Sequence, residues 1–257
     1  MRAQQLPPAA GWNWIVGGAG LYRRNPPVLG LLVVAYWFTV VLLSALPLIG
    51  TVLASLAVPG LSVGLMHSCR LLERRQTPAL QTLYGGLREN PRTLAALGAL
   101  YLACTLAILM LSSLADGGEL LRFMLSGQPL DRETVESGRL MAPATIVILL
   151  LAPVLMAYWF APVLAAWHGL PVGKALFFSL MACWINWRAF LTYGIALALV
   201  AAVLPGVVLA VLLLIFPDAA NFLTALVTVP AMLVLAPIVF ASFYVSYRDV
   251  FGIDAAA

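Results

Sequence analysis

The stretch Pro78–Leu94, P-A-L-Q-T-L-Y-G-G-L-R-E-N-P-R-T-L, decides the fold of this chain. Asn90 stands where a helix N-cap belongs, and Pro91 follows at the first helical position, where its missing N–H is not needed. An apolar run begins immediately after it. The preceding segment is amphipathic, with apolar side chains at Leu80, Leu83, Tyr84 and Leu87. We therefore predict a helix on the membrane surface, an asparagine cap and then a crossing helix.

The same order of features occurs twice more in the chain. L-Y-R-R-N-P precedes an apolar run within Leu21–Gly30, and W-I-N-W-R precedes another within Leu180–Leu191. This repetition predicts three units, each with one surface helix and two crossing helices, at about 10–75, 76–170 and 171–250. Together they form a single integral membrane domain over residues 1–257. The predicted helix caps are Asn25, Asn90 and Asn186.

The composition favours a membrane protein. The chain is 63% hydrophobic and 9% charged, with a mean hydropathy of +1.01. A soluble domain carries about 25% charged residues, so most of this surface is expected to face lipid. The fold class that follows is an all-α, polytopic membrane helical bundle.

Charge-free intervals divide the chain into spans. Crossing the hydrocarbon core takes about 20 apolar residues, and the first interval, between Arg24 and Arg70, is long enough for two crossings around a turn at Pro47–Gly50. The later intervals take one crossing each. Six spans are predicted, near 27–46, 49–69, 93–114, 142–167, 189–215 and 221–247.

The distribution of lysine and arginine predicts the orientation. Eleven of these residues lie on the side of the termini, and three (Arg122, Arg132 and Arg139) lie on the other side. The positive-inside rule then places both termini in the cytoplasm of a bacterium with an inner membrane, and the loop 115–141 outside it. Met1–Gly20 lacks the pattern of a signal peptide, so the first span is expected to direct insertion.

Aromatic residues and prolines refine this picture. Trp12, Trp14 and Tyr22 are expected at headgroup depth beside Arg23 and Arg24. The segment 171–185 is apolar on most sides and is expected to pack against the bundle. Kinked, closely packed helices are expected from the prolines within spans, which are Pro59, Pro153, Pro162, Pro205, Pro230 and Pro237.

One motif resembles a hydrolase signature. Gly60-Leu-Ser62-Val-Gly64 matches G-x-S-x-G, but the nucleophile elbow requires a strand-to-helix turn, and a membrane span has none. An intramembrane protease would also need a histidine aligned with Ser62 from another helix. The G-x-x-x-G spacing instead favours close helix packing, and no catalytic residue is predicted.

The histidines and cysteines support no cofactor site. His67 and His168 fall at similar depth and could in principle ligate a b-type haem, yet neither has a partner acid in sequence reach. Cys69, Cys104 and Cys183 lack metal-ligand spacing and are expected in the core. We predict no metal and no cofactor.

The spans contain no Asp, Glu, Lys or Arg in their interiors, which disfavours an ion-coupled pump. The leading hypothesis is a non-enzymatic accessory or scaffold protein that contacts lipids or partner membrane proteins. The alternative is a transporter or flippase of small apolar or lipidic molecules, which needs a cavity at mid-membrane depth. Membrane headgroups explain the basic face better than nucleic acid does. The predicted contacts to anionic lipid are Arg70, Arg74, Arg75, Arg88 and Arg92.

At the three asparagine-containing units, L-Y-R-R-N25-P26, G-G-L-R-E-N90-P91 and F-F-S-L-M-A-C-W-I-N186-W, the chain resembles a group of uncharacterised six-helix bacterial inner-membrane proteins. That group is similar to the membrane domain found beside some glycerophosphodiester phosphodiesterases. The resemblance covers nearly the whole chain and implies an integral inner-membrane protein. It implies no catalytic residues, and the chain has no phosphodiesterase domain.

Overall fold

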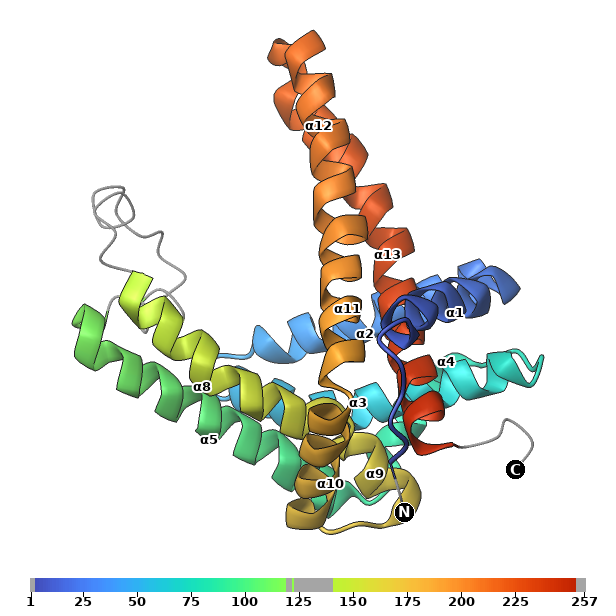
Figure 1. Ribbon diagram of the computed structural model, residues 1–257, viewed down its shortest axis with the longest axis vertical. Helices are drawn as coiled ribbons and strands as arrows, with labels where there is room; N and C mark the ends of the chain where they lie inside the picture. The colour runs from blue at the N-terminus through green and yellow to red at the C-terminus, as the bar shows by residue number, and fades with distance from the viewer. Residues whose placement is uncertain (1–2, 119–121, 123–140, 253–257) are drawn as a thin grey trace.

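The computed structural model describes residues 3–118, 122 and 141–252 (Figure 1). The described residues form helices and turns without strands, and six of their helical segments are long and apolar enough to cross a membrane. The predicted all-α bundle with six transmembrane helices is therefore confirmed. The predicted loop 115–141 lies largely outside the described residues. The spans are Pro26–Ser44, Gly50–Glu73, Pro91–Leu114, Pro143–His168, Trp187–Ile215 and Pro217–Phe251.

The order of elements follows the predicted repeat, although the exact unit boundaries stay a prediction. A surface helix precedes each pair of spans: α1 (Ala10–Arg24), α4 continued by η1 (Leu80–Gly85, Gly86–Arg88), and α10 (Val172–Ile185). The spans are formed by α2 (Pro26–Ser44), α3 (Gly50–Glu73), α5 (Pro91–Asp116), α8 and α9 (Met141–Trp159, Ala161–His168), α11, η2 and α12 (Trp187–Ala198, Leu199–Val203, Leu204–Ile215), and η3 and α13 (Pro217–Ala219, Ala220–Phe251).

Each of the three asparagines stands at the start of a span, but only Asn25 makes the expected capping bond. Its side chain accepts from the Val28 backbone N–H at 3.4 Å. Asn90 has a left-handed backbone (φ 47°), which asparagine tolerates better than most residues, and makes no capping bond to the backbone. Its Nδ2 instead donates to the Ala165 carbonyl at 3.1 Å, linking the start of α5 to α9.

Asn186 is buried and holds the N-terminal segment in place of capping α11. Its Oδ1 accepts from the Leu6 N–H at 2.8 Å, and its Nδ2 donates to the carbonyls of Gln4 and Ala182, both at 2.9 Å. The predicted cap is thus a bridge between residues 180 positions apart. The backbone of Gln4 also donates to the Val250 carbonyl, so the two ends of the described chain meet here.

The surface helices connect the units into a ring. Each one packs on the second span of another unit: α4 and η1 on α3, α10 on α8 and α9, and α1 on α13. The last of these contacts, visible in Figure 1 where α1 lies against α13, joins the first unit to the third. Because each surface helix contacts a span of another unit, these short segments hold the long apolar spans of the three units together.

Two of these contacts use glycine in the same way. A Cβ atom at Gly86 would lie 2.2 Å from the carbonyl oxygen of Gly60, the residue after Pro59. A Cβ atom at Gly18 would lie 2.6 Å from the carbonyl oxygen of Ile238, the residue after Pro237. In both contacts the surface helix approaches the backbone of the span immediately after a proline. The two backbones are too close for a side chain at the glycine.

The third contact uses a serine at a helix break. The backbone turns between α8 and α9 at Phe160, two residues before Pro162. In α10, Ser179 Oγ accepts from the Phe160 N–H at 2.9 Å and donates to the Met156 carbonyl at 2.8 Å. Backbone groups freed at a break within a membrane need such partners. The predicted packing of 171–185 against the bundle is confirmed.

Trp14 does not face the lipid headgroups, as an interfacial ring would, and its depth in the membrane stays a prediction. Its side chain is fully buried between α11 residues, with ring centroids 5.1 Å from Phe190 and 5.7 Å from Tyr193. Gly11 allows α1 to approach α11 closely, since a Cβ atom there would lie 2.2 Å from the Ala189 carbonyl oxygen, and this puts the Trp14 face of the helix in the core. Trp12, on another face, is exposed as expected.

The spans converge at one end and separate at the other. The converging end carries the surface helices and Arg24, Arg70, Arg92, Arg188 and Arg248, and we call it the basic end. Away from it, the α5–α8 pair and the α11–α13 pair point in clearly different directions (Figure 1). The main core cluster lies toward the basic end, whereas α12 buries none of its side chains.

Candidate functional site: a central pocket above the basic end

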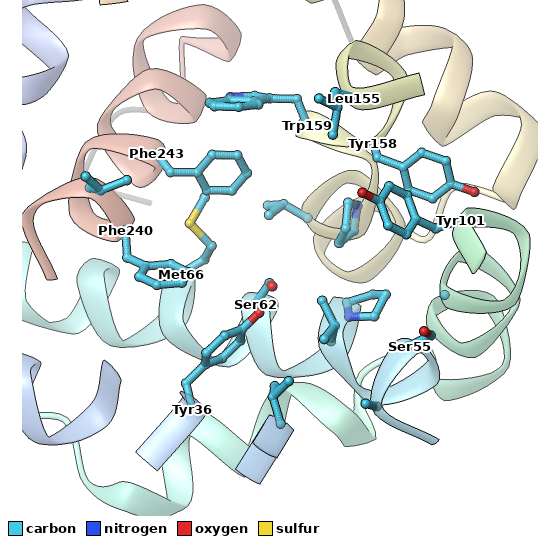
Figure 2. A pocket seen from close by; sticks show the side chains of 18 of the residues that line it. Tyr36, Ser55, Ser62, Met66, Tyr101, Leu155, Tyr158, Trp159, Phe240 and Phe243 are labelled. Carbon is cyan, nitrogen blue, oxygen red and sulfur yellow. The ribbon is translucent and has the colours of Figure 1, made fainter. Parts of the chain in front are cut away.

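A pocket of about 630 Å³ lies between the diverging spans (Figure 2). Every one of the six described spans contributes to its wall. One lining residue from each, in chain order, is Tyr36, Ser62, Tyr101, Trp159, Tyr193 and Phe240. This volume lies in the range of small-molecule sites, which is about 300–1,000 Å³.

The pocket lies near the middle of the membrane-spanning segments. Ser62 is halfway along α3, and Tyr36 is halfway along α2. With a rise of 1.5 Å per residue, Ser62 is about 12 Å along the helix axis from Arg70 at the basic end. The pocket extends from this middle region to the far end of these spans, where Ser44 is the last residue of α2 and Thr51 the second residue of α3.

The wall is apolar and carries hydroxyl groups but no charge. None of its lining residues is Asp, Glu, Lys, Arg or His. The hydroxyls of Tyr36 and Ser62 lie next to each other at one side of the cavity, and the Tyr101 hydroxyl points into it from α5 (Figure 2). The Tyr193 hydroxyl is already paired with Ser242 Oγ at 2.7 Å.

A group of packed aromatic rings closes the pocket toward the basic end. We call this group the aromatic floor: Trp159, Phe160, Trp167, Phe243 and Tyr247. Trp159 contacts Phe243 with centroids 5.2 Å apart, and Tyr247 contacts Phe160 and Trp167 at 6.1 and 5.2 Å. Phe160 and Tyr247 are fully buried. Of the five floor residues, Trp159 and Phe243 line the pocket itself.

In the described part of the chain, the contacts of His67 and His168 are to residues other than Ser62. His67, the histidine on the same helix, accepts from Trp167 Nε1 through Nδ1 at 2.9 Å, and its Nε2 lies 3.2 Å from a Glu89 oxygen. The flanking glycines serve packing, as predicted: a Cβ atom at Gly60 would lie 2.7 Å from a Leu87 methyl group. The partner of the G-x-x-x-G surface is the α4–η1 segment and not another span.

The histidines take part in structural contacts at the basic end. Because the Trp167 N–H can only donate, His67 Nδ1 is unprotonated and its proton resides on Nε2, toward Glu89. His168 Nε2 lies 2.7 Å from the Tyr247 hydroxyl. Axial haem ligation by His67 would break one of its contacts. Within the described residues, no group of three potential metal ligands occurs.

An ion pair that the sequence reasoning missed joins α3 to α13. Arg248 pairs with Glu73, and the Tyr244 hydroxyl donates to the other Glu73 oxygen at 2.6 Å. Arg24 donates to the carbonyls of Leu72 and Glu73 at 2.9 and 2.6 Å, which satisfies the C-terminal end of α3. In the sequence, the single arginine near the end of α13 indicated a possible ion pair. It could not identify Glu73 as the partner, which is 175 residues away.

The five arginines proposed to contact lipid are not equivalent. Arg70 lies over the Trp167 ring, 5.3 Å from its centroid, and is partly buried. The other four side chains are exposed around the α4–η1 segment: Arg74, Arg75, Arg88 and Arg92. Their contact with anionic lipid stays a prediction.

The cysteines occupy packing positions. Cys69 and Cys183 are buried, as expected, and Cys104 is partly buried. In the surface helix α10, burial raises the pKa of the Cys183 thiol to about 12, so the thiol is neutral at physiological pH. A neutral buried thiol is neither a good nucleophile nor a metal ligand.

Spans that repeat in pairs, surface helices that link the pairs, and a mid-depth pocket define a polytopic α-helical membrane protein. The chain is 36% identical, over 265 residues, to a probable inner membrane protein of Burkholderia thailandensis; the match covers 99% of this chain and 95% of that relative. The chain belongs to the family of that protein. No protein-family model matches the chain, and no solved structure matches it significantly.

Proposed function

We propose that this protein binds a small apolar or lipidic molecule in the central pocket and acts as its transporter or flippase. The observation that carries the proposal is the pocket itself, at mid-membrane depth and lined from all six described spans. Broken, proline-containing helices in repeated units are typical of transporters. The uncharged wall supports a carrier without ion coupling, because coupled carriers place ionisable side chains at that depth.

We further propose that both termini are cytoplasmic, as the charge distribution predicts, and that the protein is not an enzyme. In this orientation the pocket opens toward the extracytoplasmic leaflet and the aromatic floor separates it from the cytoplasm. Transport across the membrane then requires the floor to open. The rings of Trp159 and Phe243 are the part of the floor that lines the pocket, so they are the first contacts to separate.

An accessory or scaffold role is the second candidate. It is supported by α12, which has no fully buried side chain and, apart from the face that packs on α13, leaves its surface to lipid or to a partner protein. The predicted similarity to the membrane domain beside some glycerophosphodiester phosphodiesterases belongs to this candidate, since such a domain serves a neighbouring activity. That similarity stays a prediction.

A pocket-filling variant tests the proposal. Ser62→Phe adds a ring at the wall, and Val211→Phe makes a comparable addition on the exposed surface of α12. Each protein is purified in native-lipid nanodiscs, and its bound small molecules are identified by mass spectrometry after the bulk phospholipid is subtracted.

We expect a molecule that is enriched in the wild type and in Val211→Phe and is lost from Ser62→Phe. Thermal unfolding of the three proteins checks that Ser62→Phe is folded. Equal recovery from folded Ser62→Phe and wild type would contradict binding in the pocket and favour the accessory role.

A further inference from the structure

We infer that the occupant of the central pocket is an uncharged amphiphile, with a long apolar body and a hydroxyl or carbonyl group, and not an anionic phospholipid. This inference rests on the proposed function and adds the chemical class of the molecule. Three features carry it: the uncharged wall, the placement of the hydroxyl groups and the separation of the arginines from the pocket.

The wall offers nothing to neutralise a charge. A phosphate or carboxylate that moved from water into this pocket would have no cationic side chain beside it, and burial of an unpaired charge is strongly unfavourable. An arginine, lysine or histidine in the wall would stabilise such an anion, and none is among the lining residues. The apolar part of an amphiphile meets no such penalty against Val40, Val58, Leu155 and Phe240.

The hydroxyl groups form the polar part of the wall. Tyr36 and Ser62 face each other across α2 and α3, and Tyr101 approaches from α5 (Figure 2). A hydroxyl both donates and accepts, so this group can bind either an alcohol or a carbonyl. Tyr36 and Ser62 are close enough to bond to each other, and each hydroxyl keeps further capacity for a group in the pocket.

The arginines lie outside the pocket. Arg70 is stacked on Trp167, and the exposed arginines surround α4 and η1 at the basic end. An anionic headgroup held by these side chains would be separated from Ser62 by the aromatic floor and by about 12 Å of helix. The structure therefore separates an outer surface suited to anionic lipid from an inner site suited to a neutral one.

Matched photoreactive probes distinguish these sites. The first probe is a long-chain alcohol with a diazirine on its chain, and the second is the phosphate monoester of the same alcohol. Each is added to the full-length protein in phosphatidylcholine nanodiscs and irradiated, and the labelled residues are located by peptide mass spectrometry. Unlabelled alcohol is the competitor.

We expect the alcohol to label pocket residues of α3 and α5 in a manner that the competitor abolishes, and the phosphate to label them at least about tenfold less. Tyr36→Phe and Ser62→Ala, which preserve the shape of the wall, should each weaken pocket labelling by about fivefold, the effect of one hydrogen bond.

If the phosphate labels the pocket as strongly as the alcohol, and unlabelled alcohol competes with it, the inference that the occupant is uncharged is wrong. The proposed function is not contradicted by that result. Labelling of only lipid-facing positions by both probes, without competition, would instead contradict ligand binding in the pocket. Unchanged labelling in both hydroxyl variants would remove the assigned role of these hydroxyls and overturn the inference in its present form.

Discussion

Gly64 of α3 and Leu83 of α4 meet backbone to backbone, such that a Cβ atom at Gly64 would lie 1.9 Å from the Leu83 carbonyl oxygen. Gly64→Leu and Gly60→Leu should therefore prevent α4 from packing and damage folding. We expect both variants to lose most of the monodisperse protein recovered in detergent, as measured by fluorescence-detected size-exclusion chromatography.

Gly30→Leu is the matched control, because a Cβ atom at Gly30 meets nothing within 4 Å. It should elute as the wild type does, and so should Ser62→Ala. Normal recovery of Gly64→Leu would show that the close contact between α3 and α4 is not required for folding.

Asn186 bridges the N-terminal segment to α10 through three hydrogen bonds. Asn186→Ala leaves the Leu6 N–H and the Gln4 carbonyl without their partner, and we expect a loss of about 1–3 kcal/mol in local stability. Hydrogen exchange should rise at Leu6 in the variant, while exchange in α3 is unchanged. Asn25→Ala is the comparison: it should affect the start of α2 and leave the N-terminal segment protected.

Four exposed arginines surround the α4–η1 segment, and each one near an anionic leaflet contributes about 1 kcal/mol to lipid binding. Changing Arg74, Arg75, Arg88 and Arg92 to Gln should reduce the anionic phospholipid that co-purifies with the protein. Arg70 is kept, because it packs on Trp167. Lipid mass spectrometry measures the anionic fraction, with total phospholipid per protein as the control. An unchanged anionic fraction would show that these arginines set the orientation of the protein but do not bind anionic lipid.

The orientation can be tested with reporter fusions. Fusions at Gln76, Ser126, Gly173, Asp218 and the C-terminus should report inside, outside, inside, outside and inside, because the basic residues lie mainly on the terminal side. Gln76 is exposed and is preferable to Glu73, which Arg248 holds. A cytoplasmic signal at Ser126 is incompatible with six spans in this order.

The spans could be predicted from the sequence because their signal is local. A charge-free apolar run such as Pro91–Leu114 has the length that a bilayer requires, whatever its neighbours are. The glycine spacing at Gly60 and Gly64 likewise indicated close packing. It did not identify the partner, because a flat helix surface accepts a surface helix as readily as another span.

The pocket and the cross-links could not be predicted, because they depend on which helix faces meet. Tyr36, Ser62 and Tyr101 come from three spans and share no sequence pattern. Asn186 resembles Asn25 in its sequence context, yet its side chain binds a segment 180 residues earlier. Trp14 carried the pattern of an interfacial aromatic residue, and it lies in the core only because α1 packs against α11 and α13 of the third unit.

Binding of a neutral amphiphile in the central pocket is tested most directly by cryo-electron microscopy of the protein in nanodiscs made from the native membrane without detergent exchange. We expect an elongated non-protein density between α2, α3 and α5, with its end within hydrogen-bonding distance of the Tyr36, Ser62 or Tyr101 hydroxyl and no charged side chain beside it. Spans that close together until side chains fill this volume would contradict it.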